Sequence, residues 1–302
     1  GDNSITSKSS PVAVAGGHVF VAIASGGGGG SASFALKADG SAWAWGQGTS
    51  GQLGDNSITS KSSPVAVAGG HVFVEIAVKN NNSCARKADG SVWSWGFGTN
   101  GELGNNAVSN QSSPVAVAGG HVFVEIAAGI ASAGRKADGS VWTWGHATEG
   151  ELGDNTLTNK SSPVAVAGGH VFTRIVTGTY HMIACKADGS AWSWGGNIFG
   201  EIGDGTSGAG TWKSSPVAVI GGHKFVNVAI GRMISHGLKA DGSVWSWGDN
   251  TNGQIGDNTT TAGNSPVAVV GNHVFTEVVA GDSQTLARKA DGSVWAWGLG
   301  TS

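Results

Sequence analysis

Six times the chain returns to one ten-residue stretch, which in its second copy reads Lys87-Ala88-Asp89-Gly90-Ser91-Val92-Trp93-Ser94-Trp95-Gly96. Its Asp-Gly pair is a strong turn signal, because glycine readily adopts a positive φ. The residues that follow show the two-residue alternation of a β-strand, which places both tryptophans on one face of the sheet. The stretch therefore predicts a β-hairpin, and its copies begin at Lys37, Lys87, Lys136, Lys186, Lys239 and Lys289.

A second marker, Ser-Pro-Val-Ala-Val, occurs once in each repeat, with its proline at Pro11, Pro64, Pro114, Pro163, Pro216 and Pro266. We expect four short strands in a copy: Pro-Val-Ala-Val, His71 to Ala77, Ala85 to Lys87, and Ser91 to Gly96. Repeats of about 50 residues with four strands each are typical of propeller blades. The sequence therefore predicts an all-β chain that folds as one domain over residues 1–302, a six-bladed β-propeller of four-stranded antiparallel blades.

The two ends of the sequence are related to each other. Gly1 to Pro11 repeats Gly54 to Pro64 residue for residue, and Leu299 to Ser302 stop where other copies continue with a Gly-[Gln/Glu]-[Leu/Ile]-Gly motif. Residues 1–14 would thus complete the last repeat. We expect the strand Pro11 to Val14 to pair with the last blade and close the ring.

Composition excludes several classes of function. Charged residues make up only 12% of the chain, and 17 basic against 20 acidic side chains give a net charge of −3 without any basic run. A nucleic-acid or membrane-surface partner is therefore disfavoured. No stretch approaches the ~18 to 20 apolar residues of a membrane span. The two cysteines, Cys84 and Cys185, form neither a disulfide scaffold nor a metal-type spacing, and no cofactor is expected.

Two motifs resemble a known family. Trp247-Gly248-Asp249-Asn250, followed by Gly253-Gln254-Ile255-Gly256, resembles the Trp-Gly-x-Asn-x-x-Gly-Gln-Leu-Gly signature of the regulator of chromosome condensation family. Gly178-Thr179-Tyr180-His181, with Ala184 after it, is similar to that family's Gly-x-x-His-x-x-Ala segment. The resemblance covers all six repeats and implies a β-propeller.

That resemblance leaves the function open, because one fold hosts many functions. The founding eukaryotic member has seven blades and is a nucleotide-exchange factor for a small GTPase that also binds chromatin. This chain has six repeats, and it shows neither a basic tail nor an inserted exchange wedge. Other bacterial propellers of similar repeat type, including a β-lactamase inhibitor, act by protein binding alone.

Differences among the six copies collect in two segments. One lies between the second strand and the lysine, and the other follows the Trp-Gly, where one position is occupied by Gln47, Phe97, His146, Gly196, Asp249 and Leu299. Because antiparallel strands alternate in direction, both segments should lie at one end of the blades. The near-constant turns, Ala-Gly-Gly-His and Ala-Asp-Gly, should lie at the opposite end. The extra tryptophan, the single tyrosine, both methionines and both cysteines are expected on the variable side.

Amphipathic aromatics, methionine and adaptable polar residues on loops of a rigid scaffold are typical of a binding surface. We therefore expect a monomeric, non-catalytic propeller that binds a protein or peptide through these segments. The candidate binding residues are Asn81, Phe97, His146, Tyr180, His181, Met182, Phe199, Trp212, Arg232, Met233, Asp282, Leu286 and Leu299.

Two alternatives stay open at this point. One is an enzyme whose site lies at the axial opening of the same face, with His146, His181 and His236 as its polar groups; three imidazoles could hold a zinc ion. The other is an engineered or repeat-amplified scaffold without a natural partner. The Gly26 to Gly30 run lacks the Gly-Lys-Ser/Thr ending of a phosphate loop and is interpreted as a flexible loop. Six further histidines recur in the constant turn and are interpreted as structural.

Overall fold

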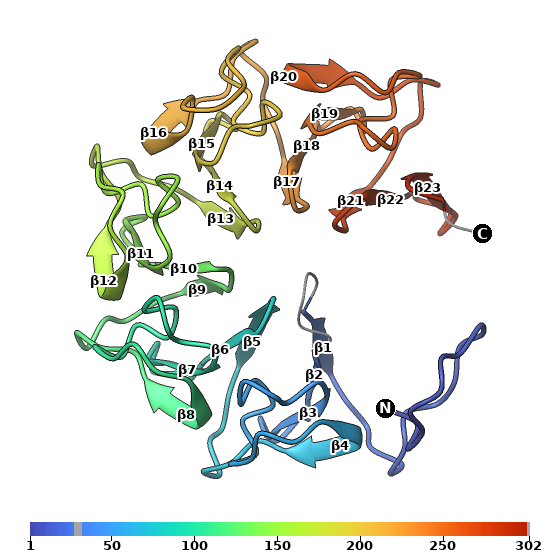
Figure 1. The fold of residues 1–302 in the computed structure, drawn as a ribbon. Helices are drawn as coiled ribbons and strands as arrows, with labels where there is room; N and C mark the ends of the chain where they lie inside the picture. The colour runs from blue at the N-terminus through green and yellow to red at the C-terminus, as the bar shows by residue number, and fades with distance from the viewer. Residues whose placement is uncertain (27–31, 301–302) are drawn as a thin grey trace. The chain divides into compact units, whose positions relative to one another are not determined.

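A computed structural model describes residues 1–26 and 32–300, so most of the glycine run at Gly26 to Gly30 lies outside the described residues. Within them, the regular secondary structure consists of β-strands, which form six antiparallel sheets (Figure 1). The expected all-β, six-bladed β-propeller is confirmed. In this part of the chain no helix is long and apolar enough to cross a membrane.

The chain divides into two compact units, each described by itself below. The first comprises Gly1–Ala137, Trp144–His146 and Asn159–Pro163. The second comprises Asp138–Thr143, Ala147–Thr158 and Val164–Ser302.

Three sheets contain the first twelve strands. The first sheet has β1 (Ala22–Ser25), β2 (Ala32–Leu36), β3 (Ala42–Gly46) and β4 (Lys61–Ala66). The second has β5 (Glu75–Lys79), β6 (Asn82–Arg86), β7 (Val92–Gly96) and β8 (Gln111–Ala116). The third has β9 (Glu125–Ala127), β10 (Ala131–Arg135), β11 (Val141–Gly145) and β12 (Lys160–Ala165).

The remaining strands form the last three sheets. The fourth sheet has β13 (Arg174–Thr177), β14 (His181–Cys185), β15 (Ala191–Gly195) and β16 (Lys213–Ala218). The fifth has β17 (Asn227–Ile230), β18 (Ile234–Leu238), β19 (Val244–Gly248) and β20 (Gly263–Ala268). The sixth, as far as the structure describes it, has β21 (Glu277–Ala280), β22 (Gln284–Arg288) and β23 (Val294–Gly298).

Each complete sheet takes its fourth strand from the next sequence repeat. In the second sheet, for example, β8 carries the Ser-Pro-Val-Ala motif that the sequence analysis assigned to the first strand of the following repeat. The blade boundary is therefore shifted by one strand from the repeat boundary. A strand from the following copy thus completes each four-stranded sheet.

The strand register confirms which segments share an end of a blade. Glu75 pairs with Arg86 beside the Lys-Ala-Asp-Gly turn, whereas Lys79 pairs with Asn82 at the opposite end. Gly96 pairs with Asn82 and with Gln111 at that same end. The turn after the first strand of a blade and the long connection after its third strand therefore lie at the same end of the blade. We call this the variable end, and the end with the Lys-Ala-Asp-Gly turn the constant end.

The first strand of each blade is shorter at its start than the sequence predicts. A strand from His71 to Ala77 was expected, but β5 begins at Glu75. The reason is that the Phe73 amide donates instead to the Gly40 carbonyl in the Lys-Ala-Asp-Gly turn of the preceding blade, at 2.9 Å. The Phe73 side chain is buried at this junction. This segment joins neighbouring blades at the constant end.

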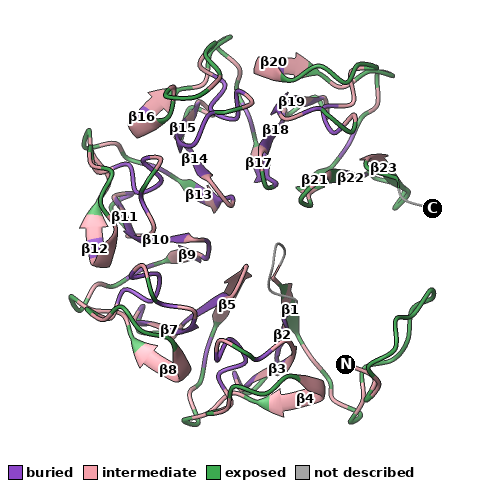
Figure 2. Cartoon of the chain, viewed as in Figure 1, coloured by how far each residue is buried: buried purple, intermediate pink, exposed green. Residues whose placement is uncertain are grey.

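Figure 2 shows which parts of the sheets are buried, and tryptophans are among the largest fully buried side chains. The second tryptophan of a pair, such as Trp95, is fully buried and donates its indole N–H to the Gln52 carbonyl of the preceding connection, at 3.0 Å. The first, Trp93, lies under the His71 ring, 4.1 Å between ring centroids, and under the Lys87 ammonium. The expectation that the recurrent histidines are structural agrees with this stacking.

A buried polar side chain fixes each connection that the tryptophans contact. Gln52, Glu102, Glu151, Glu201 and Gln254 occupy equivalent positions, and each accepts a hydrogen bond from the backbone amide two residues before it. Glu201 accepts from the Phe199 amide at 2.9 Å. The pKa of Glu201 is raised to about 7, mainly by burial and also by the nearby Glu149 carboxylate, against the lowering effect of backbone hydrogen bonds.

We predict that Glu201→Gln stabilises the protein in alkaline solution and has little effect in acid. Between the unfolded pKa of 4.5 and the folded pKa of about 7, the folded state holds a proton that the unfolded state has lost. Wild-type stability therefore falls as the pH rises through this window. Removing the carboxyl should increase the free energy of unfolding by on the order of 3 kcal/mol at about pH 8.5.

Urea unfolding of both proteins at about pH 4.5 and about pH 8.5 measures this difference. Glutamine is the native residue at positions 52 and 254, where its Oε1 accepts the same backbone bond, so the fold should tolerate it. An equal effect at the two pH values would contradict the assignment of the shift to Glu201.

The N-terminal segment already has the conformation of an interblade connection. The Ala15 amide donates to the Gly1 carbonyl at 2.8 Å, as the Ala68 amide does to the Gly54 carbonyl. Residues 11–14, however, lie outside any strand. In the last sheet the apolar residues of β23 are exposed: Val294 is 62% exposed, whereas Val244 of the fifth sheet is 2% exposed. The expected closure stays a prediction.

Closure in the register of the other blades would pair Val12 with Ala296, as Val65 pairs with Ala44. Paired residues on adjacent antiparallel strands have Cβ atoms ~4.5–5.5 Å apart, close enough for a cysteine bridge. We predict that Val12→Cys with Ala296→Cys forms an intramolecular disulfide on oxidation, detected by mass spectrometry. The matched control places the second cysteine at Val279 on β21, the other edge of the same sheet. Equal yields from the two pairs, or none from the first, would reject closure.

Candidate functional site

The two variable segments of a blade contact each other through one recurrent backbone hydrogen bond. The residue after the Trp-Gly donates its amide to the last carbonyl of the turn that precedes the second strand. The pairs are Phe97 with Asn81 (3.0 Å), His146 with Ile130 (3.0 Å), Gly196 with Tyr180 (2.8 Å), Asp249 with Met233 (2.8 Å) and Leu299 with Ser283 (2.9 Å). The positions that vary most among the copies are therefore adjacent in each of these blades.

In the second unit, three consecutive turns bring charged and aromatic side chains together. The Arg232 guanidinium lies over the Tyr180 ring, with its central carbon 5.9 Å from the ring centroid. A hydrogen bond with Tyr180 raises the pKa of Arg232, and the charges of Tyr180, Asp282 and Asp249 act in the same direction. Arg232 and Asp282 are exposed, and Tyr180 and Asp249 are half-buried. We call Tyr180, Arg232, Asp249 and Asp282 the Tyr–Arg cluster.

Glu149 adds a further carboxylate beside this cluster. A Cβ atom at Gly196 would collide with Glu149 Oε2 and would lie 3.2 Å from the Tyr180 Cβ. The absence of a side chain at position 196 therefore lets the Glu149 carboxylate approach the tyrosine. The cluster thus has one guanidinium and two carboxylates, with the Glu149 carboxylate beside its tyrosine.

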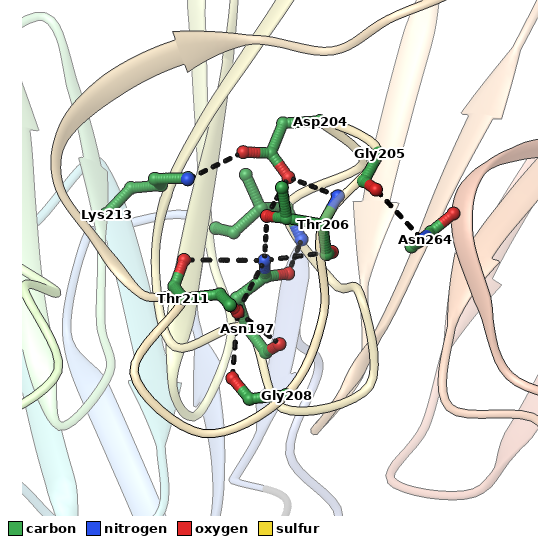
Figure 3. A network of polar contacts seen from close by, with 9 residues as sticks. Asn197, Asp204, Gly205, Thr206, Gly208, Thr211, Lys213 and Asn264 are labelled. Atoms are coloured by element: carbon green, nitrogen blue, oxygen red, sulfur yellow. Dashed lines mark hydrogen bonds and ion pairs between the residues drawn. The ribbon is translucent and has the colours of Figure 1, made fainter.

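A long connection displays an exposed tryptophan in the same unit. Between β15 and β16 lie residues 196–212, three more than the equivalent connection between β7 and β8, residues 97–110. Asn197 organises this segment: its Nδ2 donates to the Thr206 carbonyl and hydroxyl, both at 3.0 Å, and to the Thr211 hydroxyl at 3.1 Å (Figure 3). Trp212, which follows, is 39% exposed. The side chain is therefore presented from an internally bonded loop.

A second layer of contacts holds this connection from outside. The Lys213 ammonium forms an ion pair with Asp204 at 2.9 Å, and Asn264 of the next blade donates to the Gly205 carbonyl at 3.0 Å (Figure 3). The Thr211 hydroxyl also bonds the Gly208 carbonyl at 2.8 Å. These bonds reduce the conformational freedom that the loop would lose on binding a partner.

The structure leaves most of the predicted binding residues accessible at the variable end. In the first unit these are the half-buried Asn81, Phe97 and His146. In the second unit they are Tyr180, Phe199, Trp212, Arg232, Met233, Asp282 and Leu299, all half-buried or exposed.

Three predicted residues lie elsewhere. His181 and Met182 are 1% and 2% exposed, because β14 starts at His181 and draws both residues into the sheet, where His181 pairs with Gly195. Leu286 lies in the middle of β22, away from the turns. These three side chains are not part of the accessible variable end.

The two cysteines also differ from expectation. Cys185 ends β14 at the constant end, directly before the Lys186 turn, and Cys84 lies in the middle of β6. Both are buried, and neither forms a disulfide. Burial raises the pKa of the Cys84 thiol far above its usual range, and the Glu75 charge acts in the same direction. The gathering of both cysteines at the variable side was therefore a wrong expectation.

The histidines of the enzyme alternative are placed by structural hydrogen bonds. His236 is fully buried between Ser246 at 2.8 Å and Thr285 of the next blade at 3.1 Å. Burial lowers its pKa to about 3. His181 Nε2 lies 2.8 Å from the Ser235 hydroxyl of the neighbouring blade. Neither imidazole reaches a solvent-accessible site. Among the described residues no three His, Cys, Asp or Glu side chains gather as metal ligands.

Sequence reasoning missed the contribution of Glu149 and Asp249. The available signal was the position after the Trp-Gly, where the copies differ: it is Gly196 in one and Asp249 in the next. A glycine there makes room for a neighbour, and an aspartate adds a charge. The contact with Arg232 required the structure, because it joins residues from three different repeats.

Comparisons with known proteins agree with this architecture. The model of the RCC1-like domain matches residues 1–302. A search of curated proteins finds no match to the sequence. Among solved structures, Prp20p of Saccharomyces cerevisiae, described with its binding properties to Gsp1p and histones, has a TM-score of 0.81 and 25% identity. The alignment covers 93% of this chain and 72% of that one.

Two further solved structures share the fold. Yeast RCC1 (Prp20) bound to Kap60 gives a TM-score of 0.79 at 23% identity, over 92% of this chain and 70% of that one. Human WBSCR16 gives 0.71 at 20% identity, over 83% and 67%. The family model spans all six repeats, whose geometry is described above, and the chain belongs to the RCC1-like domain family.

Proposed function

We propose that this chain is a non-catalytic, monomeric protein-binding domain and that the variable end of its second unit binds a basic segment of a partner protein. The observation that carries the proposal is the Tyr–Arg cluster, which joins three consecutive blades. No chemical step is assigned to it. The residues act by shape and charge.

Charge favours a basic partner. Arg232 is the one cation that the described contacts place in the cluster, where Asp249 and Asp282 supply two carboxylates, and Glu149 adds a third carboxylate on the side of Tyr180. The excess negative charge would attract lysine and arginine side chains and steer their approach. The stack of Arg232 on Tyr180 holds the ring in place for such a contact, and a cation over an aromatic face is itself favourable.

Apolar anchors accompany these charges. Trp212 is displayed on its hydrogen-bonded loop, and Met233 and Phe199 are half-buried at the same end of their blades. Tryptophan, tyrosine and arginine are the residues that most often dominate interface energies. Asn81, Phe97 and His146 at the variable end of the first unit are proposed as additional contacts of the same kind.

The relatives support binding of a protein without identifying the partner. Prp20p is described as binding Gsp1p and histones, at 25% identity to this chain. The low charged fraction of this sequence and its lack of a basic run disfavour a nucleic-acid partner.

Purified core histones serve as a basic protein probe in a binding test by biolayer interferometry. We predict measurable binding that weakens as salt is raised, and that Tyr180→Ala and Asp282→Asn each weaken it by about tenfold. The loss on Asp282→Asn reflects removal of an attractive charge. Thermal unfolding of each variant establishes that the fold is retained.

Asp241→Asn is the matched control. Asp241 lies in a Lys-Ala-Asp-Gly turn at the constant end, where its carboxylate accepts from the Ser243 amide at 2.9 Å, a bond that asparagine can reproduce. This variant should bind as wild type does. A weakening equal to that of Asp282→Asn, or no binding of any basic probe, would reject the proposed surface.

A further inference from the structure

In the fourth blade, within the second unit, a cation replaces a carboxylate that recurs at the constant end of other blades. In three other blades a glutamate that begins the first strand pairs with an arginine that ends the second. These ion pairs are Glu75–Arg86 (2.7 Å), Glu125–Arg135 (2.6 Å) and Glu277–Arg288 (3.0 Å). In the fourth blade Arg174 occupies the glutamate position and Cys185 the arginine position, and the two residues pair in the strand register.

Because of this exchange, Arg174 has no carboxylate opposite it in the neighbouring strand, unlike the arginines of the three ion pairs. Arg174 is exposed, and no hydrogen bond or ion pair to its guanidinium occurs among the described residues. Its partner in the register, the buried Cys185, supplies no carboxylate. The fourth blade therefore has an unpaired cation where the second, third and sixth blades have an ion pair.

A second departure from the pattern lies directly before the next blade. Lys224 occupies a position that is valine in the other five copies, Val19, Val72, Val122, Val171 and Val274. Its ammonium lies 2.7 Å from Asp188 Oδ2. A hydrogen bond from Lys224 lowers the pKa of Asp188 far below its usual range, and bonds from Ser190 add to this effect. Asp188 is therefore a carboxylate.

Both departures border the same pocket. It has a volume of about 630 Å³ and is lined by Arg174, Lys186, Asp188 and Lys224, together with Phe225, Val226 and Cys185. Lys186 also lines the pocket, but its ammonium lies 4.0 Å from the centroid of the Trp192 ring, which is outside the lining. Lys224 and Asp188 neutralise each other, so Arg174 leaves one positive charge in excess at this pocket.

We propose that this pocket binds a phosphoryl group. A phosphate monoester carries about two negative charges near neutral pH, and Arg174 and Lys224 are the two cations that can contact it in this pocket. A guanidinium binds phosphate oxygens in a bidentate manner, and lysines supply point charges from other directions. The volume exceeds that of phosphate itself and includes apolar wall from Val226 and Ala240, so an organic group attached to the phosphoryl fits as well.

The site is independent of the proposed protein-binding surface. Arg174 begins β13 at the constant end, whereas Tyr180 lies in the turn at the opposite end of that strand. Failure of one proposal leaves the other intact, because the probes and the substituted residues differ.

Isothermal titration calorimetry of the full chain tests the pocket with two probes, inorganic phosphate and a phosphoserine peptide. We expect binding that weakens at high salt and that falls by about tenfold in Lys224→Val. Peptide binding tighter than phosphate binding identifies a phosphorylated side chain as the source of the group; equal or tighter phosphate binding identifies free phosphate. Absence of binding by both probes overturns the proposal.

The repeats supply folded controls. The double variant Arg174→Glu with Cys185→Arg recreates the ion pair of the second and third blades, so the strands should tolerate it, and we expect it to abolish binding. Lys87→Met, which removes a lysine over Trp93 in another blade, should leave binding unchanged. Binding that survives both Lys224→Val and the double variant would overturn the site.

Discussion

The structure depends on a hydrogen bond from an indole N–H to a backbone carbonyl of the preceding connection. Trp95 donates to Gln52, Trp194 to Glu151 and Trp247 to Glu201, at 3.0, 3.0 and 2.8 Å. The Gln52 and Glu201 carbonyls also accept from Ser83 and Ser235 of the next blade. One buried carbonyl is thus satisfied twice, and each bond joins one repeat to the following one. Glycine is needed next to this contact, since a Cβ at Gly54 would lie 2.7 Å from Trp95 Nε1.

Because the connection is fixed at this point, the residues at either side of it can vary without loss of the fold. At the variable end of the second unit, the residues that differ among the copies include the Tyr–Arg cluster of Tyr180, Arg232, Asp249 and Asp282. At the constant end, Arg174 and Lys224 depart from the pattern beside one pocket. Carboxylates are thus in excess at the Tyr–Arg cluster, and positive charge is in excess at this pocket.

Repetition made the fold and the ends of the blades predictable from the sequence. The Asp-Gly turn, the paired tryptophans and the period of about 50 residues sufficed for the number of strands in a blade and for the separation of the constant and variable turns, but not for which copy supplies the fourth strand. Strand starts were less predictable: β5 begins at Glu75 rather than near His71, because the Phe73 amide bonds a neighbouring blade. The same limit placed His181 and Met182 at the surface, although β14 already includes them.

The candidate sites required contacts between repeats, which no pattern within one repeat contains. Arg232 and Asp282 belong to different copies, as do Arg174 and Lys224. Self-comparison did mark several of these positions as unlike their counterparts. It could not indicate that a charge in one copy compensates, or fails to compensate, a charge in the next, since that depends on the packing of the blades.

The shift of one strand between the sequence repeat and the structural blade has a consequence for how such a chain can change its length. Since each four-stranded sheet takes its last strand from the following copy, an insertion or loss of one repeat length restores complete sheets wherever the break falls in the sequence. The indole contact between copies is restored as well, because donor and acceptor recur with the same spacing. Recombination between near-identical repeats would therefore add or remove whole blades, while a newly gained blade would keep the variable turns of the copy from which it came.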